Sequence, residues 1–212
     1  MKGRMVTSSR ARSKTAERIL DIAERLVQTR GFNGFSYADI STQLGITKAS
    51  LHYHFPTKDD LGATLISRYS ESFADALRAI DREAASSVGK LNAYVKLYDD
   101  VLRKDRMCLC GMLAAVNRTL SKDMQSRLQR FFDANEAWLA VVVDQGRTNR
   151  ELRFSGSAVD EARLLLGALE GAMLVARGYG EPARFTVAAS RLVDQLKAGS
   201  PPREQRRRSR TP

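Results

Sequence analysis

Cysteine, histidine and proline are scarce in this chain, which has two, two and five of them among 212 residues. Two cysteines, Cys108 and Cys110, are too few for a disulfide framework, and we expect both to be reduced. The only histidines, His52 and His54, are two positions apart, and side chains at that spacing on a helix point away from each other. A histidine-based metal site is therefore not expected, and the sequence predicts no cofactor.

Long apolar runs and catalytic motifs are also missing. No stretch approaches the roughly 18–20 apolar residues that a membrane-spanning helix needs, and the N-terminus has no apolar signal core. We therefore expect a cytoplasmic protein with no membrane partner. Because the chain has no nucleophile elbow, phosphate-binding loop or dinucleotide fingerprint, the sequence argues against an enzyme.

Positive charge is concentrated at the two ends of the chain. The net charge is +11, of which residues 1–14 carry +5 and residues 198–212 carry +4, leaving +2 for the body. We expect residues 1–12 and 198–212 to be disordered basic arms that contact nucleic acid, although the second could equally be a solubilising tail. The near-neutral body argues against an architectural DNA-packaging protein, whose basic charge would be widely spread.

The apolar spacing indicates an all-α fold. A helical pattern runs from Ser13 until Gly31 ends it, and Ser36 with Asp39 has the spacing of a capping box at the start of the next helix. About nine helices are expected, over 13–30, 36–44, 47–55, 57–82, 88–103, 106–116, 122–149, 157–178 and 184–197. They fall into two domains, 13–56 and 57–197.

Residues 36–55, SYADISTQLGITKASLHYHF, have the features of a helix-turn-helix. Gly45 supplies the turn, and Leu51 and Phe55 anchor the second helix to the core. Its remaining face carries side chains that can hydrogen-bond to phosphates or base edges, and an α-helix fits the major groove of DNA. The plainer alternative is a helical hairpin with a solvated polar face.

The stretch from Thr15 to Leu61 resembles the DNA-binding domain of the TetR family of bacterial regulators. The matching segments are ERILDIAERLVQTRGFNGFS, ADISTQLGITKASLHYHF and the closing PTKDDL, while Ser41, Ala49 and His52 depart from the usual family residues. The resemblance implies a homodimer on a palindromic operator. It implies base contacts from Lys48, Ala49 and Ser50, phosphate contacts from Ser36, Thr47, His52, Tyr53, His54 and Lys58, and minor-groove contacts from Arg10 and Arg12.

The resemblance further implies that the larger C-terminal domain holds an effector pocket and the dimer interface. The side chains that could line a pocket for a small molecule also fit a plain core, and they are Tyr94, Tyr98, Cys108, Met112, Phe131 and Trp138. Gly167 and Gly171 form a smooth strip on which another helix could pack, either within the chain or across the dimer seam.

The sequence therefore predicts a repressor that a small-molecule effector releases from DNA. An activator and a regulator controlled by a partner protein remain open. A third alternative is a redox- or electrophile-responsive regulator acting through Cys108. If Asp105 caps the helix over 106–116, Cys108 lies in its first turn, where the helix dipole would lower the pKa of the thiol. Both cysteines could instead be small buried apolar residues.

Overall fold

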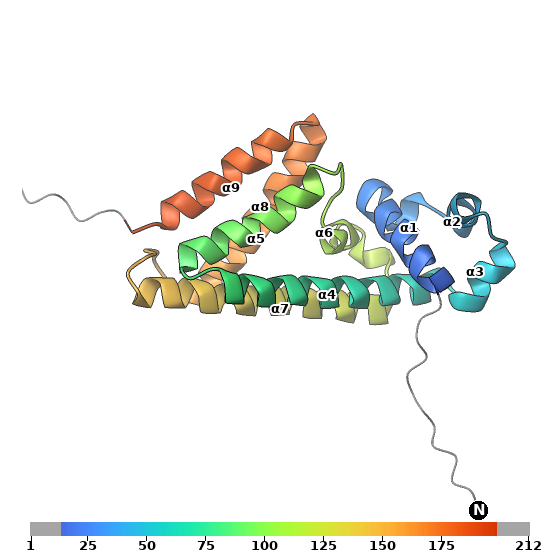
Figure 1. Ribbon diagram of the computed structural model, residues 1–212, viewed down its shortest axis with the longest axis horizontal. Helices are drawn as coiled ribbons and strands as arrows, with labels where there is room; N and C mark the ends of the chain where they lie inside the picture. Colours follow the sequence, from blue (N-terminus) through green and yellow to red (C-terminus); the bar gives the residue numbers. More distant parts are fainter. Residues whose placement is uncertain (1–13, 199–212) are drawn as a thin grey trace, which may run out of the picture.

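The computed structural model describes residues 14–198 (Figure 1), and within them the chain forms nine α-helices and two short 3-10 helices. The only β-type pairing in this part of the chain is an isolated bridge between Leu152 and Lys197. The predicted all-α fold with about nine helices is confirmed. The basic arms predicted for residues 1–12 and for the C-terminal end, with Arg10 and Arg12, lie outside the described residues, apart from Ala198.

The first three helices gather at one end of the molecule (Figure 1). They are α1 (Lys14–Arg30), α2 (Tyr37–Leu44) and α3 (Lys48–His54). Ser36 and Asp39 form the expected capping box at the start of α2. Gly45 ends α2 with φ 67°, a left-handed conformation that glycine adopts without steric cost. The predicted helix-turn-helix is therefore formed between α2 and α3.

The long helix α4 (Lys58–Glu83) leads away from this cluster and runs beside α7 (Lys122–Thr148) (Figure 1). The two helices approach closely at Gly62, where an added Cβ would lie only 2.5 Å from Cε of Met124. A side chain at this position would therefore displace the end of the Met124 side chain.

Ion pairs join α1 to α4 through a single arginine. The guanidinium of Arg68 lies 3.4 Å from the carboxylate of Glu17, 2.7 Å from that of Asp21 and 2.6 Å from that of Glu24. The three acids succeed one another along α1, so this helix presents one acidic edge to α4.

The remaining helices cover the other side of α4 and α7. They are α5 (Ser87–Leu102), the short α6 (Leu109–Ala114), α8 (Ala158–Tyr179) and α9 (Pro182–Leu196), with α8 packed against both α7 and α9. The helix predicted over 106–116 is shorter than expected. The predicted N-cap, Asp105, is wrong, because this residue has φ 55° in a turn and Cys108 is the N-cap. Across residues 14–198, none of the helices has the length and apolar character required to span a bilayer.

Candidate DNA-binding surface and ligand cavity

Buried side chains anchor the inner face of α3 to the core. Leu51 and Phe55 are buried at its inner face. The side chain of Thr47 caps the helix by accepting a hydrogen bond from the backbone N–H of Ser50. At the other end, the hydroxyl of Tyr37 donates to the carbonyl of Phe55 at 2.9 Å, and burial raises the pKa of this tyrosine. These contacts fix the direction of α3 relative to α2.

The outer face of α3 is open to solvent. Lys48, Ala49 and His52 are exposed, and Tyr53 is 79% exposed, an unusual position for a large aromatic side chain. Ser50 and His54 are half-buried, and the ring centroids of Tyr53 and His54 are 5.2 Å apart. Most of the residues assigned to DNA on sequence grounds therefore lie on one short helix with an accessible polar face, while Ser36, Thr47 and Lys58 lie outside it. Their individual contacts with bases and phosphates stay predictions.

A cleft of about 420 Å³ lies where the N-terminus of α2 meets α3. The imidazole of His52 is held there by a 3.0 Å contact between its Nδ1 and the carbonyl of Pro56 and by the ring of Tyr37 at 4.8 Å. A helix N-terminus beside cationic and polar side chains favours an anion such as a DNA phosphate. The lining residues are Phe35, Ser36, Tyr37, Ala38, Lys48, His52 and Lys58.

Lys58 has partners within the protein that the sequence did not indicate. Its Nζ donates to the backbone carbonyls of Phe32 at 2.6 Å and Phe35 at 2.5 Å. It also lies over both rings, 4.8 Å and 4.2 Å from their centroids. Partial burial lowers the pKa of this ammonium group. Lys58 therefore ties the start of α4 to the segment after α1, and its predicted phosphate contact stays a prediction.

The aromatic residues predicted to line a ligand pocket are packed in the core. Tyr94, Tyr98 and Phe131 are buried, and the hydroxyl of Tyr94 donates to Oδ1 of Asn135 at 3.1 Å. The two voids beside the tyrosines hold only about 10 Å³ each. Trp138 stacks on Tyr94 with centroids 5.5 Å apart and donates from Nε1 to Asp81 at 2.9 Å. A ligand could reach Tyr94, Tyr98 and Phe131 only by displacing core side chains, whereas Trp138 is half-buried.

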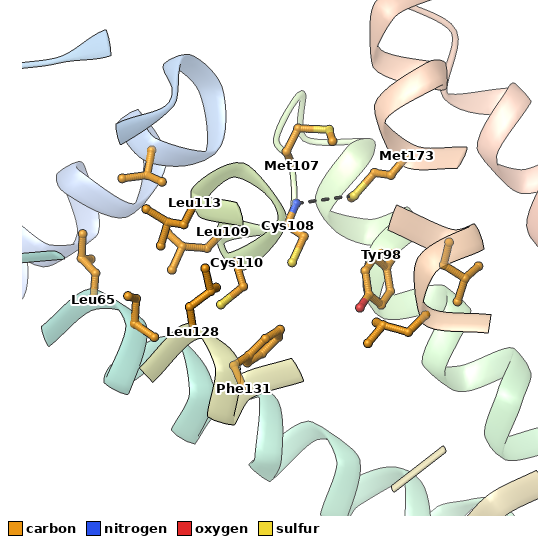
Figure 2. Close-up of a cluster of buried hydrophobic side chains, with 14 of the residues drawn as sticks. Leu65, Tyr98, Met107, Cys108, Leu109, Cys110, Leu113, Leu128, Phe131 and Met173 are labelled. Atoms are coloured by element: carbon orange, nitrogen blue, oxygen red, sulfur yellow. Dashed lines mark hydrogen bonds between the residues drawn. The ribbon is translucent and has the colours of Figure 1, made fainter. Parts of the chain in front are cut away.

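Both cysteines lie inside the same core (Figure 2). The backbone N–H of Cys108 points to the sulfur of Met173 at 3.5 Å, and its Sγ accepts from the N–H of Gly111 at 3.4 Å. Burial raises the pKa of the Cys108 thiol well above its usual value, with the Glu170 carboxyl as the next cause, and burial also raises that of Cys110. The lowered pKa predicted for Cys108 is therefore wrong, because loss of water outweighs the helix N-terminus.

A cavity of about 610 Å³ lies between α6, α7 and α8, and its walls are mainly apolar. Of the six residues predicted to touch a ligand, only Met112 lines it. Glu170 lines the cavity and was not predicted to do so, although it is a lone acid in the apolar run LLLGALEGAML. The lining residues are Met107, Gly111, Met112, Ala114, Ala115, Phe132, Glu136, Arg163, Leu166, Gly167, Glu170, Gly171 and Leu174.

The cavity wall is bonded directly to the end of α1. The backbone N–H of Met107 donates to the carbonyl of Gln28 at 3.1 Å. From α8, Arg177 donates to the same carbonyl at 3.1 Å and also to the carbonyl of Thr29. The residues around the cavity and the helix that supports the DNA-binding surface therefore share hydrogen bonds.

One face of α8 and α9 exposes large apolar side chains. Leu174 is 61% exposed, Val175 54% and Val187 65%. An added Cβ at Gly167 or Gly171 would have no described atom within 4 Å outside its own helix, so no other part of residues 14–198 packs on this strip. The intrachain alternative for the glycine strip is therefore excluded for the described residues.

Comparison with known proteins agrees with this architecture. A sequence profile described as "Bacterial regulatory proteins, tetR family" matches residues 19–63, which include α2 and α3. The Escherichia coli transcriptional repressor NemR is 25% identical over 77% of this chain and 84% of its own length. A TetR-family regulator from Agrobacterium tumefaciens is 30% identical, with a TM-score of 0.84 over 86% of this chain and 97% of that one. A TetR regulator from Legionella pneumophila is 32% identical, with a TM-score of 0.76 over 87% and 98% of the two chains.

Proposed function

Because this chain belongs to the TetR family and is a DNA-binding transcriptional regulator, we propose that it is a dimeric repressor that a small molecule releases from a palindromic operator. The observation that carries the proposal is the exposed polar face of α3, a helix whose opposite face is buried in the core. We further propose that it acts in the cytoplasm without catalytic turnover, as a binding protein for DNA and an effector.

The exposed face of α3 supports sequence-specific binding. Lys48 is exposed in the first turn of the helix, next to Ala49, where side chains can approach base edges. Ser36 and Thr47 are the N-caps of α2 and α3, where phosphates would be held. Ser36 and His52 also line the cleft. We therefore expect one part of this polar surface to contact base edges and another part to contact the DNA phosphates.

The exposed apolar face of α8 and α9 supports a homodimer. Isolated apolar residues on a surface need no explanation, but Leu174, Val175 and Val187 lie on two helices that pack against each other. A second copy related by two-fold symmetry would bury the same patch on both protomers. Two α3 helices would then face successive major grooves, which is the reason to expect a palindromic site.

The cavity beside α6 supports control by a small molecule. Its volume of about 610 Å³ falls within the range of known ligand pockets. Because Met107 and Arg177 bond to the last turn of α1, a ligand that shifts α6 or α8 would also shift the DNA-binding helices. Release follows only if the ligand binds the DNA-bound and free conformations with different affinity.

Operator selection with the purified protein tests the proposal. Double-stranded DNA recovered from a random or genomic pool should contain an inverted repeat, and Lys48→Ala should weaken binding to it by about 1–3 kcal/mol and relax the base preference. Unchanged affinity would contradict the assignment of Lys48 to a base edge. A pool without any enriched sequence would contradict the regulator function itself.

The alternative of redox or electrophile sensing through Cys108 receives no support from its surroundings. The thiol is 1% exposed, and burial raises its pKa. An activator would use the same helix and the same operator, so reporter transcription with and without the protein distinguishes activation from repression.

A further inference from the structure

The cavity between α6, α7 and α8 contains one acidic group whose hydrogen bonds are incomplete. Oε1 of Glu170 is inaccessible to solvent and has no hydrogen-bond partner, although the residue lines the cavity. A buried polar atom without a partner costs free energy in the folded protein. Such an atom beside an apolar cavity is the expected feature of a site that a ligand completes.

The carboxyl group of Glu170 lies beside α6 and the core. An added Cβ at Gly111 would lie 2.3 Å from its Oε2, so the carboxyl group is directly against α6. The thiol of Cys108 lies close to it. Burial raises the pKa of Glu170, as expected for a carboxyl group removed from water with no cation beside it.

No cation among the lining residues is free to pair with Glu170. Arg163 is the only basic residue of the cavity wall, and it pairs with Glu136 at 3.3 Å and with Asp160 at 3.4 Å. Apart from Arg163, Glu136 and Glu170, the lining residues have apolar side chains or none. The cavity therefore combines a predominantly apolar surface with one unpaired acceptor.

We propose that Glu170 is the polar anchor of the effector site and that the effector is an apolar amine bound as its cation. Its ammonium group donates to the carboxylate of Glu170 after the side chain rotates to bring the buried Oε1 to the cavity surface. Its hydrocarbon part fills the space lined by Met107, Met112 and Phe132. A charged donor matches this oxygen best, because charge-assisted hydrogen bonds are the strongest. This inference rests on the proposed function, since it assigns the chemistry of the effector to the same cavity.

Three probes of equal size and different charge test the inference on the full-length protein. They are 1-naphthylmethylamine, 1-naphthylmethanol and 1-naphthoate, each titrated by calorimetry at neutral pH. The amine should bind about tenfold more tightly than the alcohol, and naphthoate should not bind, because a hydrogen bond to an ionised group contributes more than a neutral one. Absence of amine binding, or a preference for the alcohol or naphthoate, would overturn the inference.

Glu170→Gln keeps the size of the side chain and removes its charge. It should reduce affinity for the amine by about tenfold, to that of the alcohol, and leave the alcohol within about twofold. Glu161→Gln is the matched control, because Glu161 is a half-buried acid of the same helix that does not line the cavity. Equal losses from both substitutions would overturn the anchor role. If Glu170→Gln fails to fold, the ranking of the three probes on the natural chain decides.

Operator release is measured separately, by fluorescence anisotropy of the selected DNA. Amine binding through Glu170 with no change in anisotropy would leave the anchor standing and contradict the release step of the proposed function. Release by a different class of molecule, with Glu170→Gln fully responsive, would overturn the anchor and leave the regulator function intact. No probe binding together with a changed dimer dissociation constant in Glu170→Gln would assign the cavity to the dimer seam and overturn the inference.

Discussion

At the scale of single residues, local signals and distant contacts differ in how well the sequence reveals them. The sequence predicts a capping box at Ser36, and Ser36 is an N-cap in the structure, as are Thr47 and Thr57 where the next two helices were expected to begin. A cap bonds to residues two or three positions away, so its partners are visible in the sequence. Lys58 bonds to carbonyl groups 23 and 26 residues away, and no local pattern indicates them.

The internal bonds of Lys58 lead to a first prediction at this scale. Lys58→Met should lower the free energy of unfolding by about 1–3 kcal/mol in the absence of DNA, because two buried carbonyls lose a charged donor. Lys48→Met is the control, since Lys48 is exposed, and it should change unfolding by less than about 0.5 kcal/mol while weakening operator binding. Denaturant unfolding at one protein concentration measures both. Equal stability of the two variants would contradict the structural role of Lys58.

The buried thiols lead to a second prediction. Because burial raises the pKa values of Cys108 and Cys110, the folded protein has less thiolate at neutral pH than the unfolded chain. Iodoacetamide should alkylate both thiols at least about tenfold more slowly in the native protein than in guanidinium chloride. As the pH rises through the pKa of an unfolded cysteine, the alkylation rate should increase first in the unfolded chain. Fast alkylation of native Cys108 at neutral pH, read by mass spectrometry, would restore the sensing hypothesis.

At the scale of helices, the existence of each element was predictable, whereas the start of α6 was not. The turn after α5 is closed by hydrogen bonds from Asp105 to the carbonyl of Leu102 and from Arg106 to that of Val101. The next N–H, that of Met107, is used by Gln28 of α1. These hydrogen bonds hold the chain in a turn up to Met107, with Asp105 at φ 55°, so α6 begins only after the N-cap Cys108. One of the bonds spans almost eighty residues of sequence.

The bonds from Arg177 to the end of α1 lead to a third prediction. Arg177→Met should lower the free energy of unfolding by about 1–3 kcal/mol and accelerate hydrogen exchange in the last turn of α1. The matched control is Arg78→Met, because Arg78 is exposed and pairs only with Asp75 among the described residues. If both variants exchange at the rate of the natural protein, Arg177 does not hold α1 in place.

At the scale of the whole molecule, the sequence indicated the class of function but not the location of the ligand cavity. Apolar periodicity shows which face of a helix points inward, and Tyr94, Tyr98 and Phe131 do point inward. It does not show whether the space between the helices is filled. Here the aromatic residues fill it, and the remaining space lies beside Met112 and Glu170. The exposed face of α3 was easier to predict, because one short continuous segment contains almost all of the residues assigned to DNA.

The apolar face of α8 and α9 leads to a fourth prediction. Val175→Asp should raise the dimer dissociation constant by about 100-fold or more, because the seam would bury an unpaired charge in each protomer. Val141→Asp is the control, since Val141 is 56% exposed on α7 and Val175 is 54% exposed on α8. Sedimentation should show monomers for Val175→Asp alone, together with loss of operator binding. A dimer that survives Val175→Asp would place the seam elsewhere.

The row of acids facing Arg68 has a consequence for movement. Because Glu17, Asp21 and Glu24 follow one another along α1, the guanidinium keeps a carboxylate within reach when α1 slides or rolls against α4. Such a movement lengthens some of the three ion pairs and shortens others, so at least one carboxylate stays near the guanidinium. We expect these ion pairs to oppose separation of α1 from α4 but to have little preference for one register of the two helices. Added salt should therefore weaken the ion pairs of Arg68 while leaving the apolar packing around them unchanged.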